Sequence, residues 1–159
     1  MKRILLAALV CLPCGSAPPL QNTAASSEVL AHAVLDALAL NDRAALERLV
    51  LSEQEFRDHV WPQLPASRPE RNLPFSYVWG DLRQKSSASL VKVLAEHGGR
   101  RYEFAGVEFD DTSDYSTFRV HREATFRVRD AQGEEKTVRV CGSMIEKDGA
   151  WKVFSYVVD

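Results

Sequence analysis

The stretch Tyr115–Arg129, with the sequence YSTFRVHREATFRVR, decides the fold class. Apolar and polar residues alternate along it almost without interruption, which is typical of a β-strand with one buried and one exposed face. The apolar series consists of Phe118, Val120, Ala124, Phe126 and Val128. Arg122 takes the one place in this series that is not apolar. The pattern therefore predicts one long strand with a single inward-facing arginine.

Three further segments share the same period of two. Arg101–Asp110 predicts a strand whose phase slips at Ala105-Gly106, which indicates a β-bulge. Lys136–Lys147 predicts a third strand, and Asp148-Gly149 is a strong signal for a tight hairpin into Trp151–Val157. We therefore expect a four-stranded antiparallel sheet in the second half of the chain.

The first half has the signals of helices. Ser27 begins a segment of helical period, and Asp42 is placed to cap a second short helix. Ser52–Glu55 has the spacing of a capping box, which predicts a third. The Pro-rich residues 62–74 are interpreted as an ordered surface loop.

A fourth helix is predicted by the apolar stripe of Val78–Leu94, with an interruption near Ser86-Ser87 and an end at Gly98-Gly99. Helices followed by strands predict an α+β fold, with the N-terminal helices packed on one face of a curved antiparallel sheet.

The layout resembles a known superfamily. The early paired helices, the helix that ends at glycine, and the closing hairpin Asp-Gly-Ala-Trp-Lys-Val (148–153) are similar to the nuclear transport factor 2-like (cystatin-like) superfamily over residues 27–159. The resemblance implies a cone in which a curved sheet and its helices enclose a ligand. Some members are isomerases, hydratases or cyclases, many only bind or assemble, and exported or lipid-anchored members of unknown role occur. Enzymes of this superfamily place a carboxylate base in the cone, whereas Arg122 stays protonated and is a poor base.

Strand pairing is expected to place Arg122 in a polar row. A turn at Asp130–Gly133 sets Arg122 opposite Gly142, and the last hairpin sets Gly142 opposite Ser155. The turn before the long strand brings Glu103, or Tyr102 after a bulge shift, to the other side of Arg122.

A buried arginine needs a partner, because an uncompensated buried charge is costly. One interpretation is a structural ion pair with Glu103 or with the helix carboxylate Asp81. The other is a pocket for an anion or carboxylate, with Tyr77, Trp79 and Asp81 at its mouth. The predicted pocket consists of Arg122, Tyr102, Glu103, Ser155, Gly142, Tyr77, Trp79 and Asp81.

Residues 1–17 have the pattern of an export signal peptide, because Lys2 and Arg3 precede a short apolar run. Cleavage could follow Gly15-Ser16-Ala17, although the next residue, Pro18, is unfavourable, or it could follow Thr23-Ala24-Ala25. A third possibility is a bacterial lipoprotein, in which Cys14 carries the lipid.

Residues 18–26 are interpreted as a linker or tether. Removal of the leader leaves Cys141 as the only cysteine, so the sequence predicts no intramolecular disulfide.

Charge and histidine spacing argue against two classes of function. The net charge of −2 argues against a nucleic-acid partner, and the histidines show no metal-ligand spacing. No cofactor is indicated, and membrane attachment is expected only through a lipid on Cys14.

We therefore predict an exported protein, whether periplasmic, cell-envelope or secreted, that binds a small acidic or apolar ligand or a partner protein without chemistry. One alternative is a small isomerase or hydrolyase that acts on an apolar substrate with an acidic group. The other is a homodimer through the outer sheet face, where Phe154, Tyr156 and Val158 fall.

Overall fold

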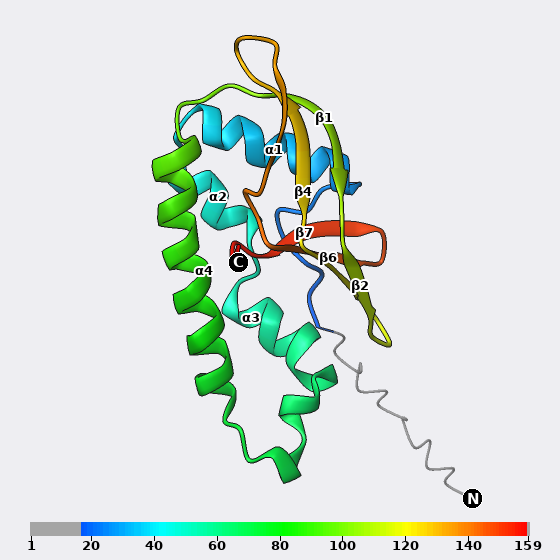
Figure 1. Cartoon of the computed structure of the whole chain (residues 1–159). Coiled ribbons are helices and arrows are strands. Elements are labelled where there is room, and N and C mark those ends of the chain that lie inside the picture. The colour runs from blue at the N-terminus through cyan, green and yellow to red at the C-terminus, as the bar shows by residue number, and fades with distance from the viewer. Residues whose placement is uncertain (1–16, 159) are drawn as a thin grey trace, which may run out of the picture.

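The structure, a computed structural model, describes residues 17–158 and has an α+β fold (Figure 1). Cys14 and the predicted leader up to residue 16 lie outside the described residues. The α-helices are α1 (Ser27–Ala39), α2 (Arg43–Leu49), α3 (Glu53–Glu55) and α4 (Phe75–His97). A π-helix (Phe56–Val60) and three 3-10 turns (Trp61–Gln63, Pro65–Ser67 and Pro69–Arg71) connect α3 to α4. No helix of the described part is long and apolar enough to cross a membrane.

α1 begins at Ser27, where its helical period predicts, and α2 and α3 begin where the capping residues predict. The side chains of Ser26, Asp42 and Ser52 accept hydrogen bonds from the first turns of α1, α2 and α3, and Ser52 and Glu55 form the predicted capping box. The expected interruption of the fourth helix is wrong, because α4 continues through Ser86. The Ser86 hydroxyl instead accepts a hydrogen bond from the backbone of Tyr156 at 2.9 Å, which ties α4 to the end of the chain.

The strands form two antiparallel sheets where one four-stranded sheet was expected. They are β1 (Glu103–Glu108), β2 (Asp111–Asp114), β3 (Arg119–Arg122), β4 (Thr125–Arg129), β5 (Glu135–Val138), β6 (Ser143–Lys147) and β7 (Ala150–Ser155). One sheet has the order β1-β4-β5 and the other β2-β3-β6-β7. The predicted bulge is confirmed, since the β1–β4 register shifts between Phe104 and Gly106.

The long strand expected over Tyr115–Arg129 is broken at Glu123. This residue has a left-handed backbone with φ of 54°, which ends β3 and lets β4 begin in the other sheet. Glu123 forms an ion pair with Arg139, which lies in the irregular segment between β5 and β6. This contact stabilises the break between β3 and β4.

Two apolar clusters cover both faces of the four-stranded sheet. Met144 and Val153 belong to the cluster beneath α1, whereas Ile145, the next residue along β6, belongs to the cluster beneath the π-helix and α4. Figure 1 shows α2 and α3 between α4 and the strands. A strand buried on both faces leaves no exposed side for a polar residue in its middle.

The predicted tether at residues 18–26 is packed on the domain. Leu20 is buried in the cluster with Ile145, and Ala24 forms an isolated antiparallel bridge with Trp151 through two hydrogen bonds of 2.8 Å.

Candidate functional site

The predicted inward arginine is on the surface. The side chain of Arg122 is 50% exposed, and its guanidinium lies 3.6 Å from Asp111 and donates a hydrogen bond to Ser113. The prediction is wrong because it assumed an unbroken strand through Glu123. Beyond that break the register is shifted by one residue, so that Arg122 pairs with Ser143 and not with Gly142.

The rest of the predicted row does not gather around Arg122. Glu103 is exposed and lies 4.0 Å from Arg129, and the Tyr102 hydroxyl is 2.9 Å from a ring nitrogen of His97. Gly142 does neighbour Ser155, to whose carbonyl it donates a hydrogen bond of 3.0 Å.

No open space lies beside Gly142. A β-carbon built there would come within 1.6 Å of the Val157 carbonyl oxygen. Glycine is therefore needed at this position for a close approach of two backbones, and it does not make room for a ligand.

The three α4 residues expected at a pocket mouth have different environments. Tyr77 is exposed, and Asp81 forms a surface ion pair of 2.8 Å with Lys85. Trp79 alone among the predicted pocket residues lines the groove described next.

We call this hollow the α4 groove. It has a volume of about 390 Å³ and lies between α4 and the segment that runs from α2 into α3, with Phe154 of β7 among its lining residues. Its size is within the range of small-molecule sites. The residues that line it are Glu47, Val50, Leu51, Ser52, Glu53, Trp79, Leu82, Arg83, Ser86, Ser87 and Phe154.

Charge and hydrogen-bonding capacity in the α4 groove are unbalanced. Glu47 and Glu53 are each paired at 2.8 Å, with Arg43 and Arg57 respectively. Arg83 has no ion-pair or hydrogen-bond partner among the described residues.

Trp79 adds a second donor without an acceptor. Its indole N–H is buried and has no partner in the described part of the chain. A buried donor of this kind costs about 1–3 kcal/mol. This nitrogen is shielded from the groove, so the unpaired group that the α4 wall offers to a ligand is the guanidinium of Arg83.

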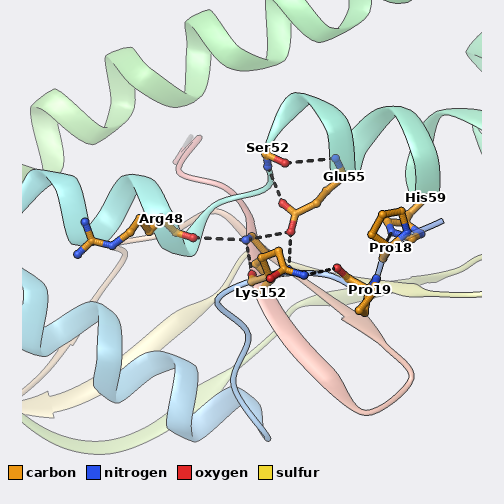
Figure 2. Close-up of polar contacts among 8 residues, drawn as sticks. Pro18, Pro19, Arg48, Ser52, Glu55, His59 and Lys152 are labelled. Carbon is orange, nitrogen blue, oxygen red and sulfur yellow. Dashed lines mark hydrogen bonds and ion pairs between the residues drawn. The ribbon is translucent and has the colours of Figure 1, made fainter.

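A buried ion pair, drawn in Figure 2, joins Lys152 of β7 to Glu55 of α3, close in sequence to the lining residues Ser52 and Glu53. The ammonium of Lys152 donates to the carbonyls of Gln21 (2.5 Å) and Arg48 (3.3 Å) and lies 3.2 Å from the Glu55 carboxylate. Glu55 also accepts from the backbone N–H groups of Gln21 (2.7 Å) and Ser52 (2.8 Å). We call these five residues the Lys152 cluster.

The pKa values of the pair follow from this environment. Burial lowers the pKa of Lys152, although the charge of Glu55 opposes the shift. Burial raises the pKa of Glu55, but hydrogen bonds from the Ser52 and Gln21 backbones and the charge of Lys152 outweigh it, so the pKa lies below its usual value. The pair is fully hydrogen-bonded and holds the groove wall in place, which makes it a structural element.

Sequence reasoning missed Lys152 and Arg83. In the alternating pattern Lys152 falls on the same side as Phe154 and Tyr156, which was taken as the outer, dimer-forming face. Tyr156 is in fact buried and donates a hydrogen bond of 2.7 Å to the Leu46 carbonyl, and after the register shift in β7 it packs in the apolar cluster opposite to that of Phe154. Phe154 was the signal that the face of Lys152 is covered.

The described residues provide neither a metal site nor a reactive cysteine. No group of three or more His, Cys, Asp or Glu residues in the described part could hold a metal ion. Cys141 is buried, and burial raises the pKa of its thiol to about 12, so it is not a reactive nucleophile at neutral pH.

Comparison with known proteins identifies no relative of this chain. No family model, no curated protein and no solved structure matches the chain.

Proposed function

We propose that this is an exported protein that binds a small amphiphilic acid in the α4 groove without transforming it. The observation that carries the proposal is the guanidinium of Arg83, a cation on the groove wall that has no negative partner among the described residues. A carboxylate or sulfonate supplies the negative charge that this wall lacks. The apolar side chains of Val50, Leu82 and Phe154 would contact the rest of such a ligand.

Binding is favoured over catalysis by the state of the acidic groups. The two carboxylates that line the groove form ion pairs with arginines four residues away in the sequence, and no histidine is among the lining residues. A proton-transfer enzyme needs an acid or base within reach of its substrate. The isomerase or hydrolyase alternative thus has no residue to carry it in this groove.

The family relationship is part of the proposal. The α+β layout, the end of α4 near Gly98 and the hairpin at Asp148-Gly149 support the resemblance to the nuclear transport factor 2-like superfamily. A cone-shaped, ligand-holding domain is a hypothesis that follows from that resemblance, as is an exported or lipid-anchored location from the leader.

The test is a titration with 8-anilinonaphthalene-1-sulfonate, an apolar aromatic anion that becomes fluorescent in such grooves. Arg83→Ala should weaken binding about fivefold, because a charged contact at a partly exposed rim is worth about 1 kcal/mol. Trp79→Phe, which keeps a ring but deletes the N–H, should change the affinity little, because this nitrogen is shielded from a ligand in the groove. Decanoate should displace the probe if carboxylates share the site.

The matched control is Lys92→Ala, which removes a positive charge from the exposed face of the same helix. Equal affinities for the wild type, Arg83→Ala and Lys92→Ala would show that the probe binds elsewhere and would refute the assignment of the groove.

A further inference from the structure

Residues 18–24 are bound to the domain through their backbone. The Pro18 carbonyl lies 2.7 Å from a ring nitrogen of His59 (Figure 2). The N–H of Gln21 donates to Glu55, and its carbonyl accepts from Lys152. Ala24 then exchanges two hydrogen bonds with Trp151. We call residues 18–25 the strap.

The strap also completes the second apolar cluster. Leu20 is only 9% exposed and packs in the cluster that contains Phe56 and Ile145. A chain that began at Ser26 would lose the Leu20 side chain. It would also lose both backbone groups of Gln21, which are the nearest acceptor of the Lys152 ammonium and one of the two backbone donors to Glu55. Buried charges that lose their partners destabilise a fold strongly. The domain is therefore built to contain the strap.

We infer that the export leader is removed upstream of Pro18 and that the strap stays in the mature protein. This inference rests on the proposed export. Of the sites that the sequence offers, cleavage after Ala25 would discard the strap, whereas cleavage after Ala17 or lipid attachment at Cys14 keeps it. The retained strap also defines where an anchor joins the domain. A lipid on Cys14 would be at most about 14 Å of extended chain from Pro18, so the domain would be held close to the membrane surface.

The experiment is expression of the full chain in an exporting bacterial host, followed by fractionation, N-terminal sequencing and intact mass measurement. An N-terminus at Pro18 or an acylated Cys14 supports the inference, and the mass distinguishes the two. An exported protein that begins at Ser26 overturns the inference and leaves export standing. A cytoplasmic chain that keeps Met1 overturns export, and the cleavage inference with it.

Three variants locate the processing step. Signal peptidases require a small residue immediately before the cut, so Ala17→Leu should accumulate precursor if the cut follows Ala17. Cys14→Ser should do so if that cysteine is acylated. Ala25→Leu is the matched control, because Ala25 is exposed and its enlargement leaves the strap contacts intact. Precursor that accumulates in Ala25→Leu alone would contradict the inference.

Hydrogen exchange on the purified protein tests the strap independently of export. The amides of Gln21 and Ala24 should be protected from exchange to the same degree as the amide of Leu51, which donates to the Val153 carbonyl at 3.0 Å in the same region. Exchange of Gln21 and Ala24 at the rate of an unstructured peptide would show that the strap is not docked, which overturns the reason for retaining it.

Discussion

Two ion pairs on the same four-stranded sheet have similar geometry and opposite surroundings. The Lys152–Glu55 nitrogen–oxygen distance is 3.2 Å and the Arg122–Asp111 distance is 3.6 Å. The first pair is 2% and 8% exposed, whereas the second is 50% and 61% exposed. Burial, and not distance, distinguishes them.

The difference decides what each pair contributes. Lys152 and Glu55 have given up hydration, so every hydrogen bond they make inside the protein replaces one lost to water. Arg122 and Asp111 remain hydrated, and solvent and salt screen their attraction. One pair is thus required by the fold that surrounds it, and the other is an ordinary surface contact.

The largest expected effect comes from breaking the buried pair. Lys152→Met keeps the apolar stem but removes the ammonium, which leaves the buried Glu55 carboxylate without its counter-charge. We expect the free energy of unfolding to fall by about 3–5 kcal/mol, measured by urea denaturation at neutral pH.

Two further variants sharpen this result. Lys92→Met makes the same substitution at an exposed site and should have little effect. The double variant Lys152→Met/Glu55→Gln should recover part of the loss, because it no longer buries an unpaired charge. A single-variant loss below about 1 kcal/mol would place this pair in the same class as the surface pair.

The second prediction concerns pH. Because the pKa of Glu55 is lowered in the folded protein, the unfolded chain takes up this proton at a higher pH than the folded chain does. The stabilisation is therefore fully present above the usual glutamate pKa of about 4.3 and is lost as the pH falls through the lowered value.

Glu55→Gln isolates this contribution. The variant should be less stable than the wild type near neutral pH, because its single amide oxygen replaces only one of the two carboxylate oxygens that accept from Gln21 and Ser52. The loss should be smaller than for Lys152→Met, because the Lys152 ammonium keeps the carbonyls of Gln21 and Arg48 as acceptors. The difference in the free energy of unfolding should shrink as the pH is lowered from about 6 to about 3. A difference that stays constant over this interval would contradict a lowered pKa for Glu55.

Local rules predicted much of the fold. Alternation found the segments of every strand except β2, and Asp148-Gly149 marked the last hairpin. The helical period marked where α1 begins, and capping residues marked where α2 and α3 begin. Each of these signals depends on side chains a few residues apart, whose geometry the local sequence dictates.

The site could not be predicted in the same way, because it depends on two long-range features. Glu123 adopts a left-handed backbone that few non-glycine residues take, and nothing in its neighbours signals the break. Because a shift of one residue reverses the face of every side chain, this break places Val120 and Arg122 on the face opposite to Ala124 and Phe126, with Arg122 half-exposed at the end of β3.

The burial of Lys152 has a comparable cause. A single sheet with one covered face would leave Lys152 in solvent, whereas the observed sheet is covered on both sides by elements distant in sequence. The partners of Lys152 come from residues 21, 48 and 55, and no local pattern links them to β7.

The smallest expected effect completes the comparison. Arg122→Ala removes a half-exposed guanidinium that contacts Asp111 and Ser113 at the surface. We expect a change of no more than about 0.5 kcal/mol in the free energy of unfolding, and this change should diminish further in high salt because the attraction is screened. The same variant should leave the affinity for 8-anilinonaphthalene-1-sulfonate unchanged, since Arg122 does not line the α4 groove. A loss above about 1.5 kcal/mol, or weaker probe binding, would instead place Arg122 in a buried site, as the alternating pattern of the sequence predicts.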